Sequence, residues 1–292
     1  MKAKRAQARG LAVVLFVICL ALPAFAATQY VVIRPVANVY SQASLDADVV
    51  SQAIYGVTVT ALDEKEGWAR IQTPDSYQGW TQAADLKKVE SPYAASGRVA
   101  HVIGLSANVY RETSVTKHAP VITVPFETRL EVLSEKPVEG ERWLQVRLPD
   151  GRTAWVQMGD VTLEPKKLSI AEAIELAKKF IGVTYTWGGT SSFGYDCSGF
   201  MQMLMRQRGI LMPRDADDQA AWSGVVPVKR EELQPGDLLY FGSSDKRITH
   251  TGMYIGNGQF IHDTTSGHPS VQISDLNEPK WSKLLVAARR AK

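Results

Sequence analysis

Cysteine is scarce in this sequence: only Cys19 and Cys197 occur among its 292 residues. Cys19 lies in an apolar stretch near the N-terminus that we expect to be removed, which leaves Cys197 as the only thiol of the mature chain. A single thiol excludes an intramolecular disulfide framework. An unpaired cysteine in an exported protein is either a reactive group or a buried residue that packs as a small hydrophobe, and the count alone leaves both open.

A run of apolar residues long enough to cross a membrane is also missing. The most apolar run, Leu11–Leu22, follows a basic head and precedes the small-residue pattern Ala24-Phe25-Ala26. This is the pattern of a secretory signal peptide over residues 1–26. Cys19 follows Ile18, which is not the small residue of a lipid-attachment site. We therefore expect cleavage, no stable membrane anchor, and export to the periplasm or to the cell exterior and wall.

A strong charge of one sign is absent as well. The formal net charge is +3, and removal of the four basic residues of the signal, which contains no acid, brings it to about −1. No affinity for nucleic acid is expected from this balance. The roughly 266 mature residues exceed the length of a typical domain, so two or three compact units are expected, and we expect a monomer.

An internal repeat organises the first half of the chain. Ala37-Asn38-Val39-Tyr40 recurs as Ala107-Asn108-Val109-Tyr110, and later tryptophans recur at a similar spacing. Short runs of alternating polarity lie between these anchors and are bounded by Gly, Pro and Asp, which predicts two small all-β barrels at residues 30–89 and 98–164. The tryptophans at equivalent strand positions are expected to lie in the barrel cores: Trp68, Trp80, Trp143 and Trp155.

In the last third of the sequence the spacing of apolar residues changes from that of strands to that of a helix. Ser169 and Glu172 form a capping box, and apolar residues from Ile170 to Ile181 fall on one helical face that ends at Gly182. A second helix is expected over 200–208. Helices followed by an antiparallel sheet predict an α+β unit over residues 168–292. The expected strands are Leu238–Phe241, Thr249–Ile255, Gln259–His262 and Leu285–Ala288.

Cys197 occupies a position that favours chemistry. It stands in Asp196-Cys197-Ser198-Gly199-Phe200, where we expect a helix to begin. Unpaired N–H groups and the positive end of the helix dipole favour a thiolate over a thiol at such a position. The sequence therefore predicts a nucleophile.

Two histidines lie where they can serve this nucleophile. His250 is on an expected strand, and Gly256-Asn257-Gly258 forms a hairpin turn, so that His262 returns one diagonal step from His250. Diagonal neighbours on one face of a sheet have Cβ atoms roughly 7 Å apart, within reach of two imidazole rings. His250 can then act as general base, and His262 can hold the ring of His250 in the useful tautomer.

These motifs resemble a known family. Asp-Cys-Ser-Gly-Phe, then His-Thr-Gly-Met-Tyr-Ile-Gly from His250, then Phe-Ile-His ending at His262, resemble the NlpC/P60 family of papain-like cysteine peptidases over about residues 168–292. The two upstream repeats resemble bacterial SH3 domains. The whole mature chain is similar to the YkfC-type γ-D-glutamyl-L-diamino acid endopeptidases of this family.

The resemblance implies a reaction and roles for four residues. Cys197 would attack the bond between γ-D-glutamate and diaminopimelate or lysine in peptidoglycan stem peptides. His250 would be the general base, His262 the orienting residue, and Tyr185 a neighbour of the sulfur that aids the oxyanion hole. The implied partners are stem peptides or released muropeptides, and no metal or other cofactor is implied.

The resemblance also places residues at the edge of the substrate site: Asp196, Ser198, Arg214, Asp215 and Tyr77. An acid such as Asp196 suits a substrate ammonium, and a donor such as Arg214 suits a carboxylate. Asp196 as a simple N-cap, and Arg214 as a simple ion-pair partner of Asp215, are the structural alternatives.

One departure from the family concerns the group that binds the substrate amine. Gln42 stands at the expected position of an acidic residue, with Asp46 and Asp48 nearby. This leaves open whether a free N-terminal L-Ala is required.

Two other functions remain open at this point. The same thiolate could serve an N-acetylmuramoyl-L-alanine amidase or an acyltransferase. A wall-binding protein without catalytic activity is the alternative from another class, because SH3-like repeats by themselves indicate binding.

Overall fold

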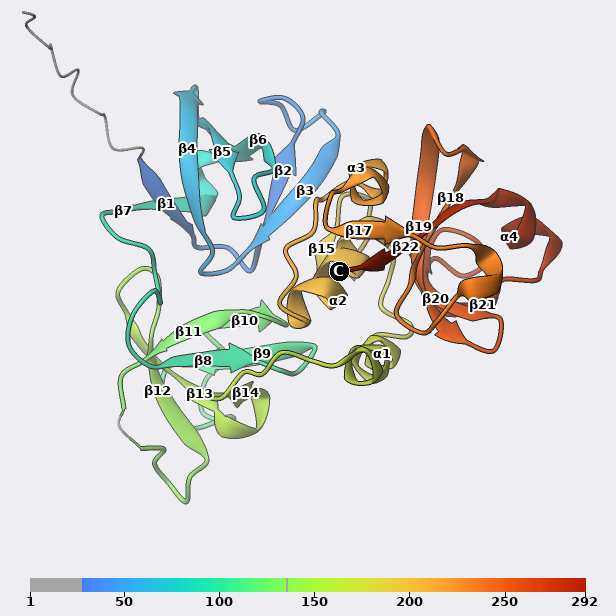
Figure 1. Cartoon of the computed structure of the whole chain (residues 1–292). Coiled ribbons are helices and arrows are strands. Elements are labelled where there is room, and N and C mark those ends of the chain that lie inside the picture. Colours follow the sequence, from blue (N-terminus) through green and yellow to red (C-terminus); the bar gives the residue numbers. More distant parts are fainter. Residues whose placement is uncertain (1–27, 135) are drawn as a thin grey trace, which may run out of the picture.

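The computed structural model describes residues 28–134 and 136–292. The expected signal peptide, and Cys19 within it, lie outside the described residues. Two all-β units are followed by an α+β unit, so the expected fold class is confirmed (Figure 1). In the part of the chain that the structure covers, no helix is both long and apolar enough to cross a membrane.

The first unit is a seven-stranded antiparallel sheet with the order β3-β2-β6-β5-β4-β1-β7. Alternate residues of its strands point inward, and Val39, Val59 and Ile71 are among its buried core. Its elements are β1 (Gln29–Val32), β2 (Val36–Tyr40), β3 (Val49–Ile54), β4 (Thr58–Lys65), β5 (Trp68–Gln72), β6 (Gln78–Gln82), η1 (Ala83–Asp85) and β7 (Leu86–Val89).

The second unit repeats this topology strand for strand, in the order β10-β9-β13-β12-β11-β8-β14. The sequence repeat is therefore a structural one. Its elements are β8 (Val99–Val102), β9 (Ser106–Tyr110), β10 (Ile122–Pro125), β11 (Arg129–Val132), β12 (Trp143–Arg147), β13 (Thr153–Gln157), η2 (Met158–Asp160) and β14 (Val161–Thr162).

An aromatic pair is reproduced in both copies. The rings of Tyr40 and Trp68 lie edge to face at 5.4 Å, and those of Tyr110 and Trp143 repeat this at 5.4 Å. The expectation that all four repeat tryptophans are core residues was wrong, because only Trp143 is buried. The other three, Trp68, Trp80 and Trp155, remain partly exposed.

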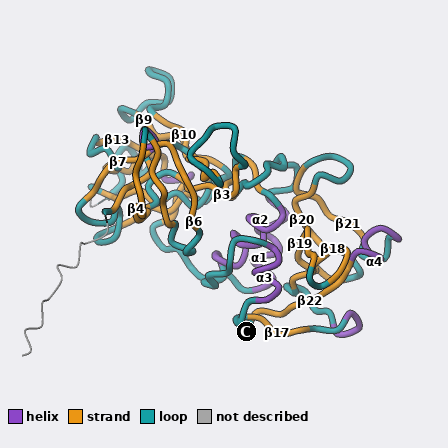
Figure 2. Tube along the Cα trace, turned by 90° about the horizontal axis from the view of Figure 1, so that it is seen from above, coloured by secondary structure: helices purple, strands orange, loops and turns teal. Residues whose placement is uncertain are grey.

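The third unit packs its helices against a six-stranded sheet with the order β17-β22-β18-β19-β20-β21 (Figure 2). The four expected strands are present and longer than expected, whereas the other elements of this unit after α2 and the short strands before it were not expected: β15, β16, α3, β17, η3, β21 and α4. Its elements are α1 (Ile170–Lys179), β15 (Thr190–Ser191), β16 (Gly194–Tyr195), α2 (Cys197–Gln207), α3 (Ala216–Ala221), β17 (Val225–Pro227), η3 (Arg230–Glu232), β18 (Leu238–Ser244), β19 (Arg247–Gly256), β20 (Gln259–Thr264), β21 (Ser270–Asp275), α4 (Pro279–Leu284) and β22 (Leu285–Ala291).

Helix α1 begins with the expected capping box, in which Ser169 and Glu172 bond reciprocally. Ile174 and its neighbours at helical spacing are buried, but Ile170 and Ile181 are exposed, contrary to expectation. Ile170 is the first residue of the helix and Ile181 lies beyond its end at Lys179, so neither continues the buried stripe.

Both β-units bond to helix α2 and to the segment before it. The first unit bonds to the strand beside the start of α2, where the Thr190 backbone N–H donates to Gln52 Oε1 at 3.0 Å. The second unit holds the end of α2, where Glu127 accepts two hydrogen bonds from Arg206, at 2.9 and 2.6 Å, and one from Gln207.

Gly188 allows the first unit to approach closely. Its φ is +72°, and a Cβ added there would lie 2.4 Å from the Val49 carbonyl oxygen of β3. We expect Gly188→Ala to lower the free energy of unfolding by about 1–2 kcal/mol from the left-handed backbone alone, with more from the clash. Urea unfolding of the full chain measures this. Gly159→Ala, where a Cβ meets nothing within 4 Å, is the matched control, and equal losses in the two variants would contradict the prediction.

Candidate active site

Cys197 is the first residue of helix α2, and Asp196 is its N-cap. The helix packs against β19 and β20, so the sulfur lies between the start of the helix and the sheet, with the residue 8% exposed. The backbone N–H groups of Thr251 on β19 and Ser198 on α2 face the sulfur and lower the pKa of its thiol. These donors create a site where negative charge can be accepted.

The thiol is nevertheless neutral in this arrangement, which differs from the expected thiolate. Burial raises the pKa of the Cys197 thiol to about 12, and the neighbouring Asp196 carboxylate adds to the rise. The two backbone donors and Arg214 oppose this shift but do not overcome it. The start of the helix is enclosed by the sheet, so desolvation of a charged sulfur outweighs the helix dipole. A base is therefore needed to remove the proton.

The two histidines form a direct hydrogen-bonded pair. His250 Nε2 lies 2.7 Å from His262 Nδ1, and His262 Nε2 lies 3.0 Å from Ser274 Oγ on β21. The chain is complete when each Nε2–H donates to the next group, which leaves Nδ1 of His250 as an unprotonated acceptor. This is the ring nitrogen that a general base needs.

Both imidazoles are held neutral. Burial lowers the pKa of His250 to about 3 and that of His262 to about 2, and the Lys280 ammonium lowers both further. Trp281 of α4 stacks on His250 with ring centroids 5.4 Å apart and meets His262 edge to face at 4.9 Å. This aromatic cover accounts for the desolvation of the pair.

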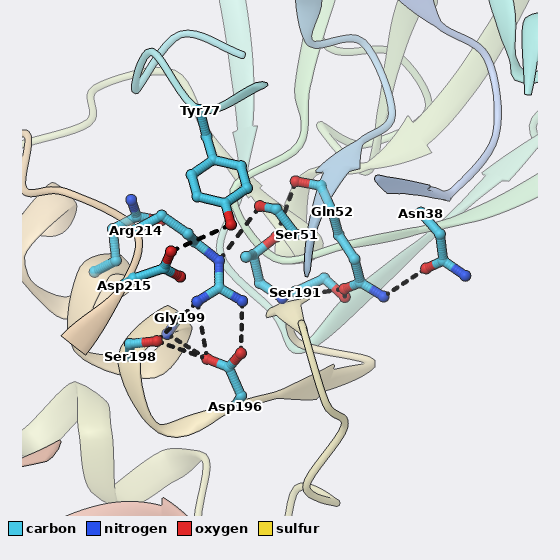
Figure 3. Close-up of polar contacts among 12 residues, drawn as sticks. Asn38, Ser51, Gln52, Tyr77, Ser191, Asp196, Ser198, Gly199, Arg214 and Asp215 are labelled. Carbon is cyan, nitrogen blue, oxygen red and sulfur yellow. Dashed lines mark hydrogen bonds and ion pairs between the residues drawn. The ribbon is translucent and has the colours of Figure 1, made fainter. Parts of the chain in front are cut away.

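A buried ion pair stands beside the nucleophile (Figure 3). Arg214 donates to both carboxylate oxygens of Asp196, at 2.6 and 3.1 Å, and to Ser198 Oγ at 2.8 Å. The Gly199 backbone N–H also donates to Asp196 at 2.7 Å, which is the N-cap bond of α2. Ser51 of the first β-unit accepts a further bond from Arg214.

This network alters the expectation for three residues. Asp196 and Arg214 satisfy each other instead of a substrate ammonium and carboxylate, and Arg214 does not pair with Asp215. Ser198 is enclosed within the same network. The three side chains bond to one another at the start of α2.

Tyr77 of the first β-unit meets Asp215 of the third unit beside this network (Figure 3). The Tyr77 hydroxyl donates to Asp215 Oδ2 at 3.2 Å, and both side chains are partly exposed. Burial raises the pKa of Asp215 and raises that of Tyr77 to about 12. Gln42 is exposed, and no side-chain bond joins it to either residue.

Tyr185 lies near the sulfur, as expected. Burial raises the pKa of Tyr185, and the neighbouring Cys197, Asp196 and Asp263 side chains add to the rise. The phenol is therefore a neutral hydrogen-bond donor at any working pH.

Several residues of the site were not anticipated from the sequence. Ser274 lies on a strand that was not expected, and Trp281 lies on a short helix without a sequence signal. Asp263 carried a signal: an acid at the position that alternates with the buried Ile261 indicates a polar group facing the core. No three His, Cys, Asp or Glu side chains among the described residues are grouped to hold a metal ion.

Comparisons with known proteins agree with this arrangement. The model of the NlpC/P60 family matches residues 182–290, and that of the bacterial SH3 domain matches residues 35–87 and 106–162. A γ-D-glutamyl-L-lysine dipeptidyl-peptidase of Bacillus cereus is 32% identical over 262 residues, which cover 82% of this chain and 74% of that protein. The enzyme of the same name from Bacillus subtilis is 29% identical over 258 residues, covering 84% and 82%.

A solved structure is similar over nearly the whole chain. The crystal structure of an NlpC/P60 family protein from Bacillus cereus aligns with a TM-score of 0.78 at 27% identity, covering 90% of this chain and 99% of that one. The order and packing of the three units are therefore shared with that protein.

Proposed function

Because this chain belongs to the NlpC/P60 family of cysteine peptidases, we propose that it hydrolyses the bond between γ-D-glutamate and a diamino acid in peptidoglycan peptides. The observation that supports this most is the hydrogen-bonded His250–His262 pair on the sheet against which the helix of Cys197 packs. The names of the two Bacillus relatives specify lysine as the diamino acid. We propose that the diamino acid of the substrate is either lysine or diaminopimelate.

The proposed reaction starts from a neutral thiol and a neutral imidazole. His250 Nδ1 takes the proton of Cys197 as the sulfur attacks the γ-carbonyl carbon of D-glutamate. Backbone N–H groups at the start of α2 and the Tyr185 hydroxyl stabilise the resulting oxyanion. His250 returns the proton to the amine of the diamino acid, which leaves. Water, deprotonated by His250, then releases the acyl group and regenerates the thiol.

The amine end of the substrate is proposed to lie against Tyr77 and Asp215. Asp215 keeps one oxygen without a side-chain donor, so it can accept from the ammonium of an N-terminal L-Ala. The acidic residue that the family resemblance implied is replaced by Gln42. Asp215 would then carry the recognition of the amine alone.

This recognition can be measured with two substrates, L-Ala-γ-D-Glu-L-Lys and its N-acetylated form. Asp215→Asn is expected to raise KM for the free-amine peptide about 10- to 100-fold, because it removes a charge-assisted bond worth about 1.5–3 kcal/mol. Tyr77→Phe should raise it only a few-fold. Asp217→Asn, an exposed neighbour, is the control. Equal cleavage of both peptides by the parent would remove amine recognition and leave the peptidase assignment intact.

Product analysis by mass spectrometry tests the reaction itself. Release of L-Ala-D-Glu with a free lysine or diaminopimelate amine is expected. Release of the intact stem peptide from the lactyl group of muramic acid would indicate an amidase. Transfer of the acyl group to an added amine would indicate an acyltransferase. Wall binding without any product would leave only the binding function.

We further propose that the enzyme acts outside the cytoplasm, in the periplasm or at the wall, where peptidoglycan lies. Some relatives match a shorter part of the chain. The name of one of them, a murein endopeptidase of Escherichia coli, supports a wall substrate. We also propose a division into units at 30–89, 98–164 and 168–292, which is supported by the extent of the two β-sheets, Gln29 to Val89 and Val99 to Thr162.

A further inference from the structure

The second β-unit contains a cavity of about 460 Å³ that the reaction above does not use. It is lined by residues of the β9–β10 loop and of the turn between β12 and β13. Its basic lining residues are Arg111, His118 and Arg152, and no acidic residue of the described chain lines it. Val121 and Leu148 belong to its apolar lining. A cavity of this volume can hold a small ligand, and the lining favours a ligand with negative charge and an apolar part.

The acidic side chains next to the lining residues already have cationic partners. Glu112 pairs with Lys117 at 2.8 Å, and Asp150 pairs with Arg152 at 2.6 Å. Arg152 uses Nε and Nη2 for this pair, so its Nη1 remains available to a ligand. Arg111 makes no hydrogen bond or ion pair with any residue that the structure describes. The cavity therefore carries positive charge that the protein itself does not compensate.

The duplication of the β-fold identifies the counterpart of this cavity in the first unit. The Pro-Asp pair of the β5–β6 turn recurs in the β12–β13 turn, and the flanking strands have the same register, so Arg152 is the counterpart of Tyr77. The register of β3 on β2 and of β10 on β9 makes Pro120 the counterpart of Val49. The loop that carries the two other basic residues is longer in the second unit, 111–121 against 41–48.

This face of the fold is covered in the first unit and open in the second. Tyr77 bonds to Asp215 at 3.2 Å, and the Val49 carbonyl lies against Gly188, so the third unit covers the first copy. The second copy contacts the third unit through a different segment, which includes Glu127. All residues that line the cavity belong to the second unit. The face that the first copy turns to the third unit is therefore accessible to a ligand in the second copy.

We propose that this cavity binds a carboxylate of a peptidoglycan stem peptide, so that the second unit holds one peptide of the wall while Cys197 cleaves another. The chemistry of the ligand follows from the cavity, whereas its source in the wall rests on the proposed function. A planar guanidinium binds a carboxylate through two parallel hydrogen bonds. His118 Nε2 lies 3.1 Å from Glu112 Oε1, so Arg111 and Arg152 are the donors for the ligand. The apolar lining suits the alkyl part of an amino acid.

NMR titration of the isotope-labelled Cys197→Ala chain tests the site without hydrolysis. L-Ala-γ-D-Glu-L-Lys should shift the amide signals of Gly151 and Thr153, while signals of the active site report binding there separately. Adding Arg111→Gln should raise the dissociation constant at the turn about ten-fold, because a hydrogen bond between charged groups is lost. Arg142→Gln, which replaces an exposed arginine of the same unit outside the cavity, is the matched control and should leave the constant unchanged.

Two further probes decide which group the cavity recognises. The same tripeptide with its carboxylates amidated should bind at the turn about ten-fold more weakly or not at all. Inorganic phosphate at the concentration of the free tripeptide should not displace it. Equal binding of the amidated and free tripeptides would overturn the proposal. Displacement by equimolar phosphate would also overturn it, because the site would then select a phosphate group and not a peptide carboxylate.

A wall-binding measurement separates this site from the catalytic one. Arg111→Gln in the Cys197→Ala chain should lower the fraction that sediments with intact sacculi, whereas Arg111→Gln in the parent should leave kcat/KM for the soluble tripeptide unchanged. An unchanged sedimented fraction would contradict a role in holding the wall. If the tripeptide is not cleaved but the signals of the turn shift, the proposed function fails and the binding site stands. Cleavage without any shift at the turn would sink the binding site alone.

Discussion

Replacement of Cys197 by serine or alanine is expected to lower kcat/KM for L-Ala-γ-D-Glu-L-Lys at least about 10,000-fold, to the limit of detection. The sulfur forms the bond to the acyl group, and a serine hydroxyl is harder to ionise than a thiol that already has a pKa of about 12. The side chain is small and lies at the helix start, so the fold should remain intact. Mass spectrometry of timed digests gives the rate.

Two controls make this result specific. Iodoacetamide should modify Cys197 in the parent chain and remove activity in parallel, and the tripeptide should protect against it. His268→Ala removes an exposed histidine that belongs to none of the motifs and should retain full activity. Undiminished hydrolysis by Cys197→Ala would eliminate the thiol mechanism altogether.

Arg214→Met is expected to lower the free energy of unfolding by about 3–5 kcal/mol, because it leaves the Asp196 carboxylate buried without its cation. The Arg214 side chain is 1% exposed and its shortest bond to Asp196 is 2.6 Å. Activity should fall with stability, since Asp196 caps the helix that carries Cys197. Urea unfolding monitored by tryptophan fluorescence measures the change.

The Arg152–Asp150 pair is a matched control for burial. Its N–O distance is also 2.6 Å, but the Arg152 side chain is 63% exposed. Arg152→Met should therefore cost no more than about 1 kcal/mol. The double variant Asp196→Asn with Arg214→Met should recover part of the loss of the single variant. Similar losses at Arg214 and Arg152 would show that burial does not govern the Asp196 pair.

Local patterns predicted much of the architecture. The capping box at Ser169, the hairpin at Asn257 and the diagonal relation of His250 and His262 are set by residues close in sequence. The repeat around Tyr40 and Tyr110 predicted two copies of one fold, because such a repeat places equivalent residues in equivalent packing.

The features of the site that could not be predicted from the sequence depend on contacts between distant segments. Ser51 meets Arg214 across 163 residues, and no periodicity indicates such a contact. The charge state of Cys197 was misjudged for the same reason. The helix start favours a thiolate locally, but the enclosing strand β19 and the Asp196 carboxylate reverse the balance.

The two copies of the β-fold contact the α+β unit with corresponding segments: Gln52 of β3 bonds to Thr190, before α2, and Glu127, just after β10, bonds to Arg206 in the last turn of α2. The two copies of the duplicated fold thus both make contacts around one helix. The second copy contacts α2 at Arg206 and Gln207, in its last turn, whereas Cys197 is the first residue of the helix. Both duplicated units therefore contribute to the position of the helix that carries the sulfur.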